Sequence, residues 1–280
     1  MIWDGEVRMR NNKLSQYIWI CVGALLAVMF IFPIYIMIIS SLKPVTQIFD
    51  LRLIPDTITF SNYLDIFTKQ KFQVFVLNSS IISVSVTVIS LLIHSMSAFA
   101  LARLRFPGRK FIFLLILSTM MIPFSVIMIP LFITVRSLGL TNNLLGVILP
   151  SIPSAFGIFL LNQFLLGIPT ELEEAAKVDG ASLFRIYRSI ALPLSKPILS
   201  TLAAMYFIGN WNNYLWPLIV TPGRKFWVIQ VAIANFKGEH AVEWNLILAA
   251  SVVASLPVIV LFIFFQRYLV EGIKMTGIKD

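Results

Sequence analysis

Six long apolar runs, separated by short polar segments, constrain this chain more than any other feature of its sequence. A helix needs about 20 apolar residues to cross the hydrocarbon core of a bilayer, and each run is long enough. Charged residues make up 12% of the chain, whereas soluble domains contain about 25%. The sequence therefore predicts an all-α integral membrane protein that forms a single domain over residues 1–280. The expected spans are residues 17–42, 74–101, 111–135, 144–166, 198–220 and 246–268.

The distribution of Lys and Arg predicts the orientation of these spans. Fourteen of the 22 basic residues lie before the first span or after the second, fourth and sixth. Loops rich in Lys and Arg stay in the cytoplasm. Both termini are therefore expected in the cytoplasm, and residues 43–73 and 221–245 are expected outside.

Three further features limit the class of protein. The first apolar run is too long for a signal peptide and lacks a small-residue cleavage site near its end, so we interpret it as a retained span. Cys21 has no partner for an intramolecular disulfide, and no Cys/His spacing typical of a metal site occurs. The net charge of +9 does not indicate nucleic-acid binding, because the basic residues are spread over loops instead of following one face.

The loop of residues 169–197, expected in the cytoplasm, concentrates the acidic side chains. Thr170 followed by Glu173 predicts a capping box at the start of a helix, and Gly180 predicts its left-handed stop. A second short helix is expected over residues 182–190, ended by Leu192-Pro193. Four of the chain's 13 acidic residues lie in this loop: Glu171, Glu173, Glu174 and Asp179.

This helix–turn–helix loop fits a docking surface better than the alternatives. Catalysis needs carboxylates that converge on a shielded pocket, whereas these are expected on an exposed helix without His or Cys. A solvated loop does not explain the small side chains of Ala175 and Ala176, which let another surface approach the backbone closely. A docking surface for a partner is therefore the favoured interpretation.

The same loop resembles the EAA loop of permease subunits of ABC importers. The matching residues are EEAAKVDGAS (Glu173–Ser182) followed by IALPLSKP (Ile190–Pro197). Three segments narrow the resemblance to the smaller permease of the carbohydrate, maltose-type family: AFALARLRFPGRK, LGLTNNLLGVILP and NWNNYLWP. The tail QRYLVEGIKMTGIKD resembles the family's ending but departs from it at Met275–Asp280.

The resemblance implies a set of partners and a division of labour. A second homologous permease, two ATPase subunits and an extracytoplasmic sugar-binding protein are expected beside this chain in a bacterial or archaeal cytoplasmic (inner) membrane. The chain lacks a G-x-x-x-x-G-K-[ST] phosphate loop, so it is expected to bind no cofactor and to be no enzyme, with ATP and Mg on the ATPases. The residues expected to dock an ATPase are Glu173, Glu174, Ala175, Ala176, Asp179, Gly180, Ala181, Ser182, Leu192 and Pro193.

The fifth expected span holds a cluster of amides and aromatic rings that fits two interpretations. Stacking rings and amide groups suit a sugar, so the cluster is a candidate substrate path. The same side chains suit an interfacial aromatic belt with amides that bond between helices, which we favour. The cluster comprises Asn210, Trp211, Asn212, Asn213, Tyr214 and Trp216.

Two further features allow alternatives. The resemblance implies that the segment 221–245 faces the binding protein, with a solvated loop as the alternative. Its candidate contacts are Asn235, Lys237, Gly238 and Glu239. His94, a lone imidazole in the second span, fits a hydrogen-bonded packing residue better than a proton carrier.

Three other functions compete with sugar import by this machinery. The same machinery could carry glycerol phosphate or another polyol derivative. A stand-alone secondary transporter would need ionisable residues inside its spans, and only His94 is available. An intramembrane enzyme would need a convergent set of Ser/His, Asp/Asp or metal ligands in the spans, and the sequence has none.

Overall fold

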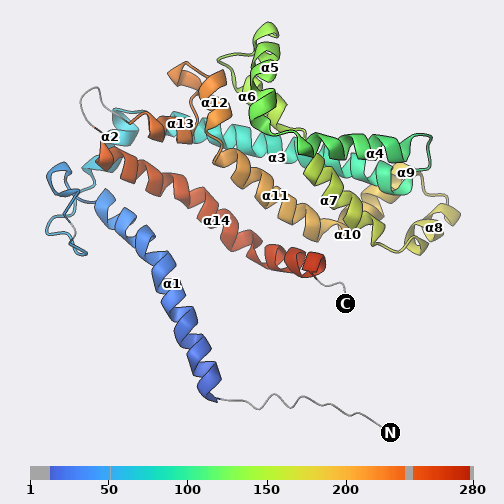
Figure 1. Ribbon diagram of the computed structural model, residues 1–280, viewed down its shortest axis with the longest axis horizontal. Coiled ribbons are helices and arrows are strands. Elements are labelled where there is room, and N and C mark those ends of the chain that lie inside the picture. Colours follow the sequence, from blue (N-terminus) through green and yellow to red (C-terminus); the bar gives the residue numbers. More distant parts are fainter. Residues whose placement is uncertain (1–12, 51, 237–241, 278–280) are drawn as a thin grey trace.

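The computed structural model describes residues 13–50, 52–236 and 242–277, and this part of the chain is helical without a β-strand (Figure 1). The predicted all-α class is therefore correct. Three helices are each long and apolar enough to cross a membrane: α1 (Lys13–Ser41), α3 (Phe72–Arg103) and α14 (Trp244–Gly277). They correspond to the expected first, second and sixth spans.

The third and fourth expected spans are each broken into two helices. α4 (Arg109–Ser118) and the 3-10 turn η2 (Thr119–Met121) meet α5 (Phe124–Ser137) at 101°. α6 (Leu144–Ser151) meets α7 (Ala155–Leu166) at 40°. The expected spans 111–135 and 144–166 therefore each consist of a bent pair of helices, and their crossing of the membrane stays a prediction.

Prolines account for these two breaks. Pro123 and Pro153 lie at the junctions, where proline has no amide hydrogen and the residue before it is pushed towards extended backbone. Ile122 accordingly has φ −92° and ψ 113°. By contrast, Pro33, Pro130, Pro150 and Pro257 lie inside helices.

The fifth expected span, 198–220, is also interrupted. α11 (Lys196–Trp211) ends before three non-helical residues, and α12 (Leu215–Val220) follows. The segment before α11 comprises α9 (Leu183–Ile186), the π-helical turn η3 (Tyr187–Ala191) and α10 (Leu192–Leu194), and it bends by 75° from α11. The helical segment therefore ends at Leu194, slightly beyond the predicted stop.

Short elements lie at two opposite ends of the long helices (Figure 1). One end carries α2 (Ser61–Thr68) and α13 (Ile229–Ala234), close in sequence to the 3-10 turns η1 (Val45–Gln47) and η4 (Arg224–Phe226). The other end carries α8 (Glu171–Val178). This separation agrees with opposite sides of a membrane for the two sets of loops, and the assignment of α8 to the cytoplasm stays a prediction.

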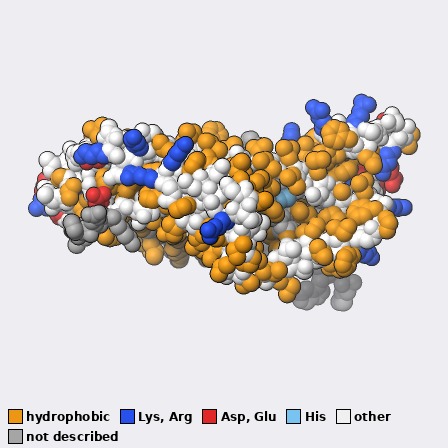
Figure 2. Space-filling view, turned by 90° about the horizontal axis from the view of Figure 1, so that it is seen from above, with side chains coloured by type: hydrophobic (Ala, Val, Ile, Leu, Met, Phe, Trp, Pro, Cys, Tyr) orange, Lys and Arg blue, Asp and Glu red, His pale blue; other side chains and the backbone are white. Residues whose placement is uncertain are grey.

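The surface between these ends is apolar. Figure 2 shows hydrophobic side chains across the middle of one face, with most Lys and Arg towards its ends. No residue in the most apolar stretch of α1 is buried inside the chain. Such a large apolar surface needs lipid or a partner subunit to cover it.

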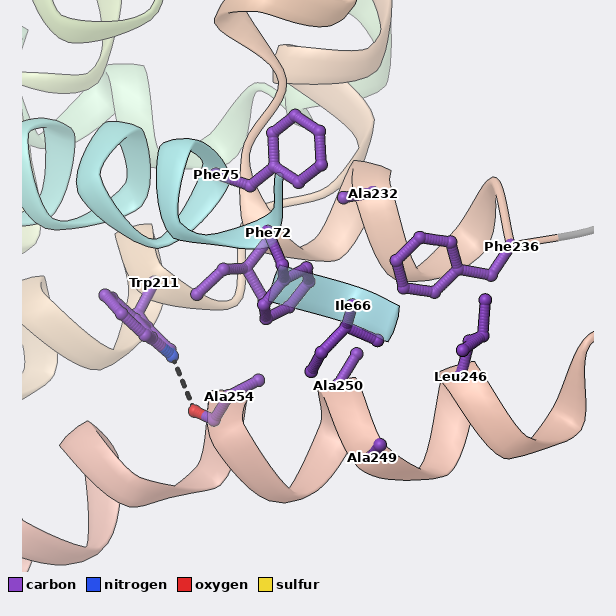
Figure 3. Close-up of a cluster of buried hydrophobic side chains, with 11 residues drawn as sticks. Ile66, Phe72, Phe75, Trp211, Ala232, Phe236, Leu246, Ala249, Ala250 and Ala254 are labelled. Atoms are coloured by element: carbon purple, nitrogen blue, oxygen red, sulfur yellow. Dashed lines mark hydrogen bonds between the residues drawn. The ribbon is translucent and has the colours of Figure 1, made fainter. Parts of the chain in front are cut away.

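The largest buried cluster joins five helices, as Figure 3 shows. Ile66 of α2, Phe72 and Phe75 of α3, and Trp211 of α11 pack against the small side chains of α14. Trp211 also donates its Nε1–H to the carbonyl of Ala254 over 2.9 Å. Since alanines on α14 let the helices approach closely, the cluster holds α14 against α3 and α11.

Buried polar side chains of α3 anchor the segment expected outside. The amide of Asn78 donates to the carbonyls of Lys225 and Trp227, both over 2.9 Å. The hydroxyl of Ser79 accepts the backbone N–H of Ile229 over 2.9 Å. These bonds satisfy backbone groups that no helix pairs, and they fix η4 and α13 to the end of α3.

Candidate coupling surface and transport path

α8 does not begin with the predicted capping box. Thr170 has helical dihedral angles, φ −73° and ψ −21°, and its side chain accepts no capping hydrogen bond. Glu173 is turned into the protein with an exposed fraction of 4%. The Thr-x-x-Glu spacing was therefore misinterpreted, because Glu173 has a partner elsewhere.

That partner is Arg103, the last residue of α3. Its Nε donates to Oε1 of Glu173 over 2.6 Å, and its Nη2 donates to the carbonyl of Ile168 over 2.8 Å. The side chains of Arg103 and Glu173 are 8% and 5% exposed. Burial of both charges is tolerated because each meets the other and the guanidinium also satisfies a backbone carbonyl.

The remaining residues of the predicted docking surface divide between two faces. Ala176, Ala181 and Leu192 are partly buried and pack against the core formed by α3, α7 and α11. The exposed members are Glu174, Ala175, Asp179, Gly180, Ser182 and Pro193. Only this second group is free for a partner in the isolated chain.

Gly180 and Ser182 shape the turn after α8. Gly180 has φ +78°, a left-handed conformation that L side chains rarely adopt. The hydroxyl of Ser182 accepts the backbone N–H of Arg185 over 3.3 Å and so caps α9. The predicted glycine stop and second helix are therefore present.

Sequence reasoning missed the apolar part of this exposed surface. Val178 is 88% exposed and lies between Lys177 and Asp179. Leu172 is 49% and Phe184 62% exposed in the same loop. A helix face that only meets water favours polar residues. A valine between two charged residues could therefore have indicated that Val178 is exposed in order to contact a partner.

A groove of about 790 Å³ separates α8 from the residues that follow α3. Arg105, Arg109 and Lys177 line it beside the internally paired Arg103 and Glu173, and Glu174 adds one further carboxylate. The groove therefore carries an excess of positive charge next to the exposed face of α8.

The structure separates the predicted substrate-path cluster into packing and exposed residues. Trp211 is 1% and Trp216 2% exposed, and Trp216 donates its Nε1–H to the carbonyl of Gly146 over 3.2 Å. Asn212 and Tyr214 are exposed at the break between α11 and α12. Both tryptophans thus serve as packing residues.

The two other amides of that cluster are partly buried. The side chain of Asn210 donates to the carbonyl of Tyr206 over 2.8 Å, inside its own helix. Asn213 lies at the same break as Asn212. Asn212 accepts from the side chain of Gln230 over 3.2 Å, which links the break to α13.

Of the residues predicted to contact a binding protein, one is described. Asn235 is exposed just after α13, where its side chain donates to the carbonyl of Val231 over 2.8 Å. Lys237, Gly238 and Glu239 lie outside the described residues, as does His240.

Two side chains of α3 satisfy the backbone at the break between α6 and α7. The hydroxyl of Ser90 donates to the carbonyl of Ile152 over 2.8 Å. Nε2 of His94 accepts the backbone N–H of Ser154 over 3.2 Å. A broken helix inside a membrane requires such partners, so the arrangement agrees with the packing interpretation of His94.

Comparison with known proteins identifies the family. Residues 95–275 match the family model described as "Binding-protein-dependent transport system inner membrane component". The chain belongs to this family. The match begins within α3 and therefore includes Arg103, α8 and the three bent helix pairs found in the described part of the permease.

Two similar permeases are named for sugars. The permease is 38% identical to the arabinooligosaccharides transport system permease protein AraQ of Halalkalibacterium halodurans, with 91% of this chain and 94% of the relative covered. It is 38% identical to the trehalose transport system permease protein SugB of Mycobacterium tuberculosis, covering 91% and 93%. The predicted family, permeases of carbohydrate ABC importers, is confirmed.

A solved structure supports the same fold. The permease superposes with a TM-score of 0.82 on a chain of a bacterial ABC transporter involved in the import of the acidic polysaccharide alginate. The two chains are 25% identical, and the alignment covers 92% of this permease and 98% of that chain. The overall helical fold, which includes the three bent helix pairs, is therefore shared with a solved transporter.

Proposed function

We propose that this permease is one membrane-spanning subunit of an importer that moves a sugar or oligosaccharide into the cytoplasm, driven by ATP hydrolysed on partner subunits. One observation carries the proposal: α8 presents an exposed face of acidic, small and apolar residues at the end opposite the segment expected outside. The proposed partner of this face is an ATPase subunit that binds ATP and Mg, and membership of the family of binding-protein-dependent transport components supports this proposal.

The docking surface consists of the exposed members of the predicted set together with Val178. Glu174 and Asp179 supply charge for a basic rim, while Ala175 and Gly180 allow close approach of the partner's surface. Ala176, Ala181 and Leu192 support the surface from behind, and Glu173 is buried away from it. Pro193 and Ser182 complete its margin.

Three further partners complete the proposed importer. A second homologous permease would cover apolar surface such as that of α1 and α5, where Phe30, Val126 and Ile129 are each more than 60% exposed. A second ATPase would dock to that subunit. An extracytoplasmic sugar-binding protein would contact the segment 221–245, within which α3 holds η4 and α13 in place. A bacterial alginate ABC transporter of the same fold, with a TM-score of 0.61, was solved in complex with an alginate pentasaccharide-bound periplasmic protein.

Uptake by the reconstituted complex tests the proposal. The permease is placed in proteoliposomes with the permease, ATPase and binding protein encoded beside it. We expect uptake of a labelled sugar only with ATP inside and the binding protein outside. Uptake driven by a proton gradient without ATP would instead identify a stand-alone secondary transporter.

Glycerol phosphate is the second candidate substrate. The sn-glycerol-3-phosphate transport system permease protein UgpE of Salmonella typhi is 34% identical to this permease, with 87% of this chain and 90% of that protein covered. Titration of the neighbouring binding protein with oligosaccharides and with glycerol phosphate separates the two. Binding of glycerol phosphate alone would overturn the sugar assignment.

A further inference from the structure

We propose that the Arg103–Glu173 ion pair couples the ATPase-docking helix α8 to α3, so that α3 carries the movement of α8 across the membrane. The inference rests on the proposed function. In it Arg103 and Glu173 are positioning residues, because neither needs to touch ATP, the ATPase or the substrate.

The position of the pair is the first reason. Arg103 is the final residue of α3, and Glu173 lies in the first turn of α8. One guanidinium bonds both Glu173 and the carbonyl of Ile168, so it holds α8 and the residues leading into it. A guanidinium can bond both at once because its donors form a rigid fork.

Burial of the pair is the second reason. Glu171 and Glu174 lie on the same helix and are exposed, whereas Glu173 is 4% exposed. The side chains of Arg103 and Glu173 are 8% and 5% exposed although they border the groove, so little water reaches Glu173 to replace Arg103 as its partner. A shift of α8 consequently moves the end of α3 unless this buried pair breaks.

Polar contacts along α3 extend this connection. Near the pair, the hydroxyl of Ser95 lies 2.8 Å from that of Tyr187 in η3. Further along, Ser90 and His94 hold the break between α6 and α7. At the far end, Asn78 and Ser79 hold η4 and α13.

α3 is the element that joins these contacts. It is continuous over 32 residues, and it bonds the coupling loop, a broken span and the segment expected outside. A continuous helix transmits displacement between its ends better than the bent helix pairs beside it. The Arg103–Glu173 pair is the point at which α8 joins this helix.

Glu173→Gln tests the coupling in the complete complex, with Glu171→Gln as the matched control. Both variants remove one carboxylate from the first turn of α8, but only Glu173 has a buried partner. For Glu173→Gln we expect the ATPase to co-purify normally while sugar transported per ATP falls about 5- to 10-fold, the low end of the range for a typical coupling free energy. Glu171→Gln should match the unsubstituted chain.

Arg103→Lys provides a second variant if Glu173→Gln fails to insert. Lys keeps the positive charge but cannot bond Glu173 and Ile168 together with one planar fork. We expect an intermediate loss of transport per ATP with normal ATPase binding. Transport per ATP equal to that of the Glu171→Gln complex for both variants would overturn the proposal.

A distance measurement separates this inference from the proposed function. Spin labels at Met96 on α3 and Lys177 on α8, both exposed, are placed in the full chain with Cys21 replaced by Ser. We expect one narrow distance distribution, and a broad one with Glu173→Gln. An unchanged narrow distance distribution in the Glu173→Gln protein would reject the coupling role, whichever solute the complex transports. A broadened distribution in that variant, together with a complex that shows no ATP-driven uptake, would reject only the proposed function.

Discussion

His94 and Tyr206 join the second and fifth spans: Nδ1 of His94 lies 2.8 Å from the hydroxyl oxygen of Tyr206. The rings meet edge to face, with centroids 5.6 Å apart. Since Nε2 of His94 accepts the N–H of Ser154, Nδ1 carries the proton and donates to Tyr206. One neutral imidazole therefore connects α3, α7 and α11.

We predict that His94→Phe destabilises the permease more than Tyr206→Phe. Phe fills a similar volume, but it leaves the Ser154 N–H without its acceptor at a helix break. An unsatisfied buried donor costs about 1–3 kcal/mol. Tyr206→Phe leaves one such donor, the Nδ1–H of His94, and keeps the Ser154–His94 bond, whereas His94→Phe breaks both hydrogen bonds of the imidazole. Thermal unfolding in detergent measures the difference, and equal midpoints for His94→Phe and the unsubstituted chain would contradict this role.

A pair of glycines tests how closely α7 approaches this site. A Cβ at Gly157 would clash with the hydroxyl of Tyr206 and lie 3.2 Å from Nδ1 of His94, whereas a Cβ at Gly209 would meet nothing within 4 Å. We expect Gly157→Ala to destabilise the permease by about 1–3 kcal/mol through overpacking. Gly209→Ala is the control and should be neutral or slightly stabilising, because Ala favours helix.

The measurement for this glycine pair is again thermal unfolding, with uptake recorded on the same samples. A Gly157→Ala protein as stable as the Gly209→Ala protein would show that α7 does not need to pack closely against Tyr206 and His94.

Sequence reasoning succeeded where one local pattern decided the structure. The long apolar runs of α1, α3 and α14 have no competing signal, so the prediction places these helices close to the stretches that are long and apolar enough to cross a membrane, Gln16–Ser41, Phe72–Arg103 and Trp244–Gln266. The left-handed turn at Gly180 follows from the conformational freedom of glycine itself.

It failed where a distant residue decided the outcome. Glu173 fits a capping box locally, yet Arg103, 70 positions away, binds its carboxylate instead. The proline at position 123 accounts for a break in the helix, but the size of the bend there, 101°, depends on packing that the sequence does not display. Trp211 and Asn212 are neighbours in sequence with opposite burial, because α11 ends between them.

Gly180 gives a prediction about docking. A β-branched residue at φ +78° is strained by about 1–2 kcal/mol, so Gly180→Val should displace the turn and reduce ATPase co-purification. Gly180→Asn should retain far more of it, because Asn tolerates the left-handed region. Both are measured by affinity purification of the complex from membranes.

The control for Gly180→Val is the same substitution at a second glycine with the same φ, in another part of the chain. Gly108 also has φ +78°, and a Cβ added at either glycine would meet nothing within 4 Å. Gly108→Val should therefore impose similar strain without loss of the ATPase. Equal loss from Gly108→Val and Gly180→Val would assign the effect to general instability and contradict docking at α8.

The divided amide–aromatic cluster gives the last prediction. Trp211→Phe keeps the stack on Phe207, whose ring is 5.6 Å away, but loses the hydrogen bond to Ala254. We expect a loss of stability of about 1 kcal/mol and an unchanged KM for sugar uptake. Asn212→Ala, at the exposed break, should instead raise that KM about 3- to 10-fold if its amide bonds the passing sugar.

Gln230→Ala separates a direct effect of Asn212 from a structural one. It removes the side chain that donates to Asn212 while leaving the Asn212 amide in place, so KM should change little. A raised KM for Gln230→Ala equal to that for Asn212→Ala would mean that the bond between the two residues, and not contact with the sugar, is what matters. An unchanged KM for Asn212→Ala together with a raised one for Trp211→Phe would reverse the assignment and place the sugar against the buried ring.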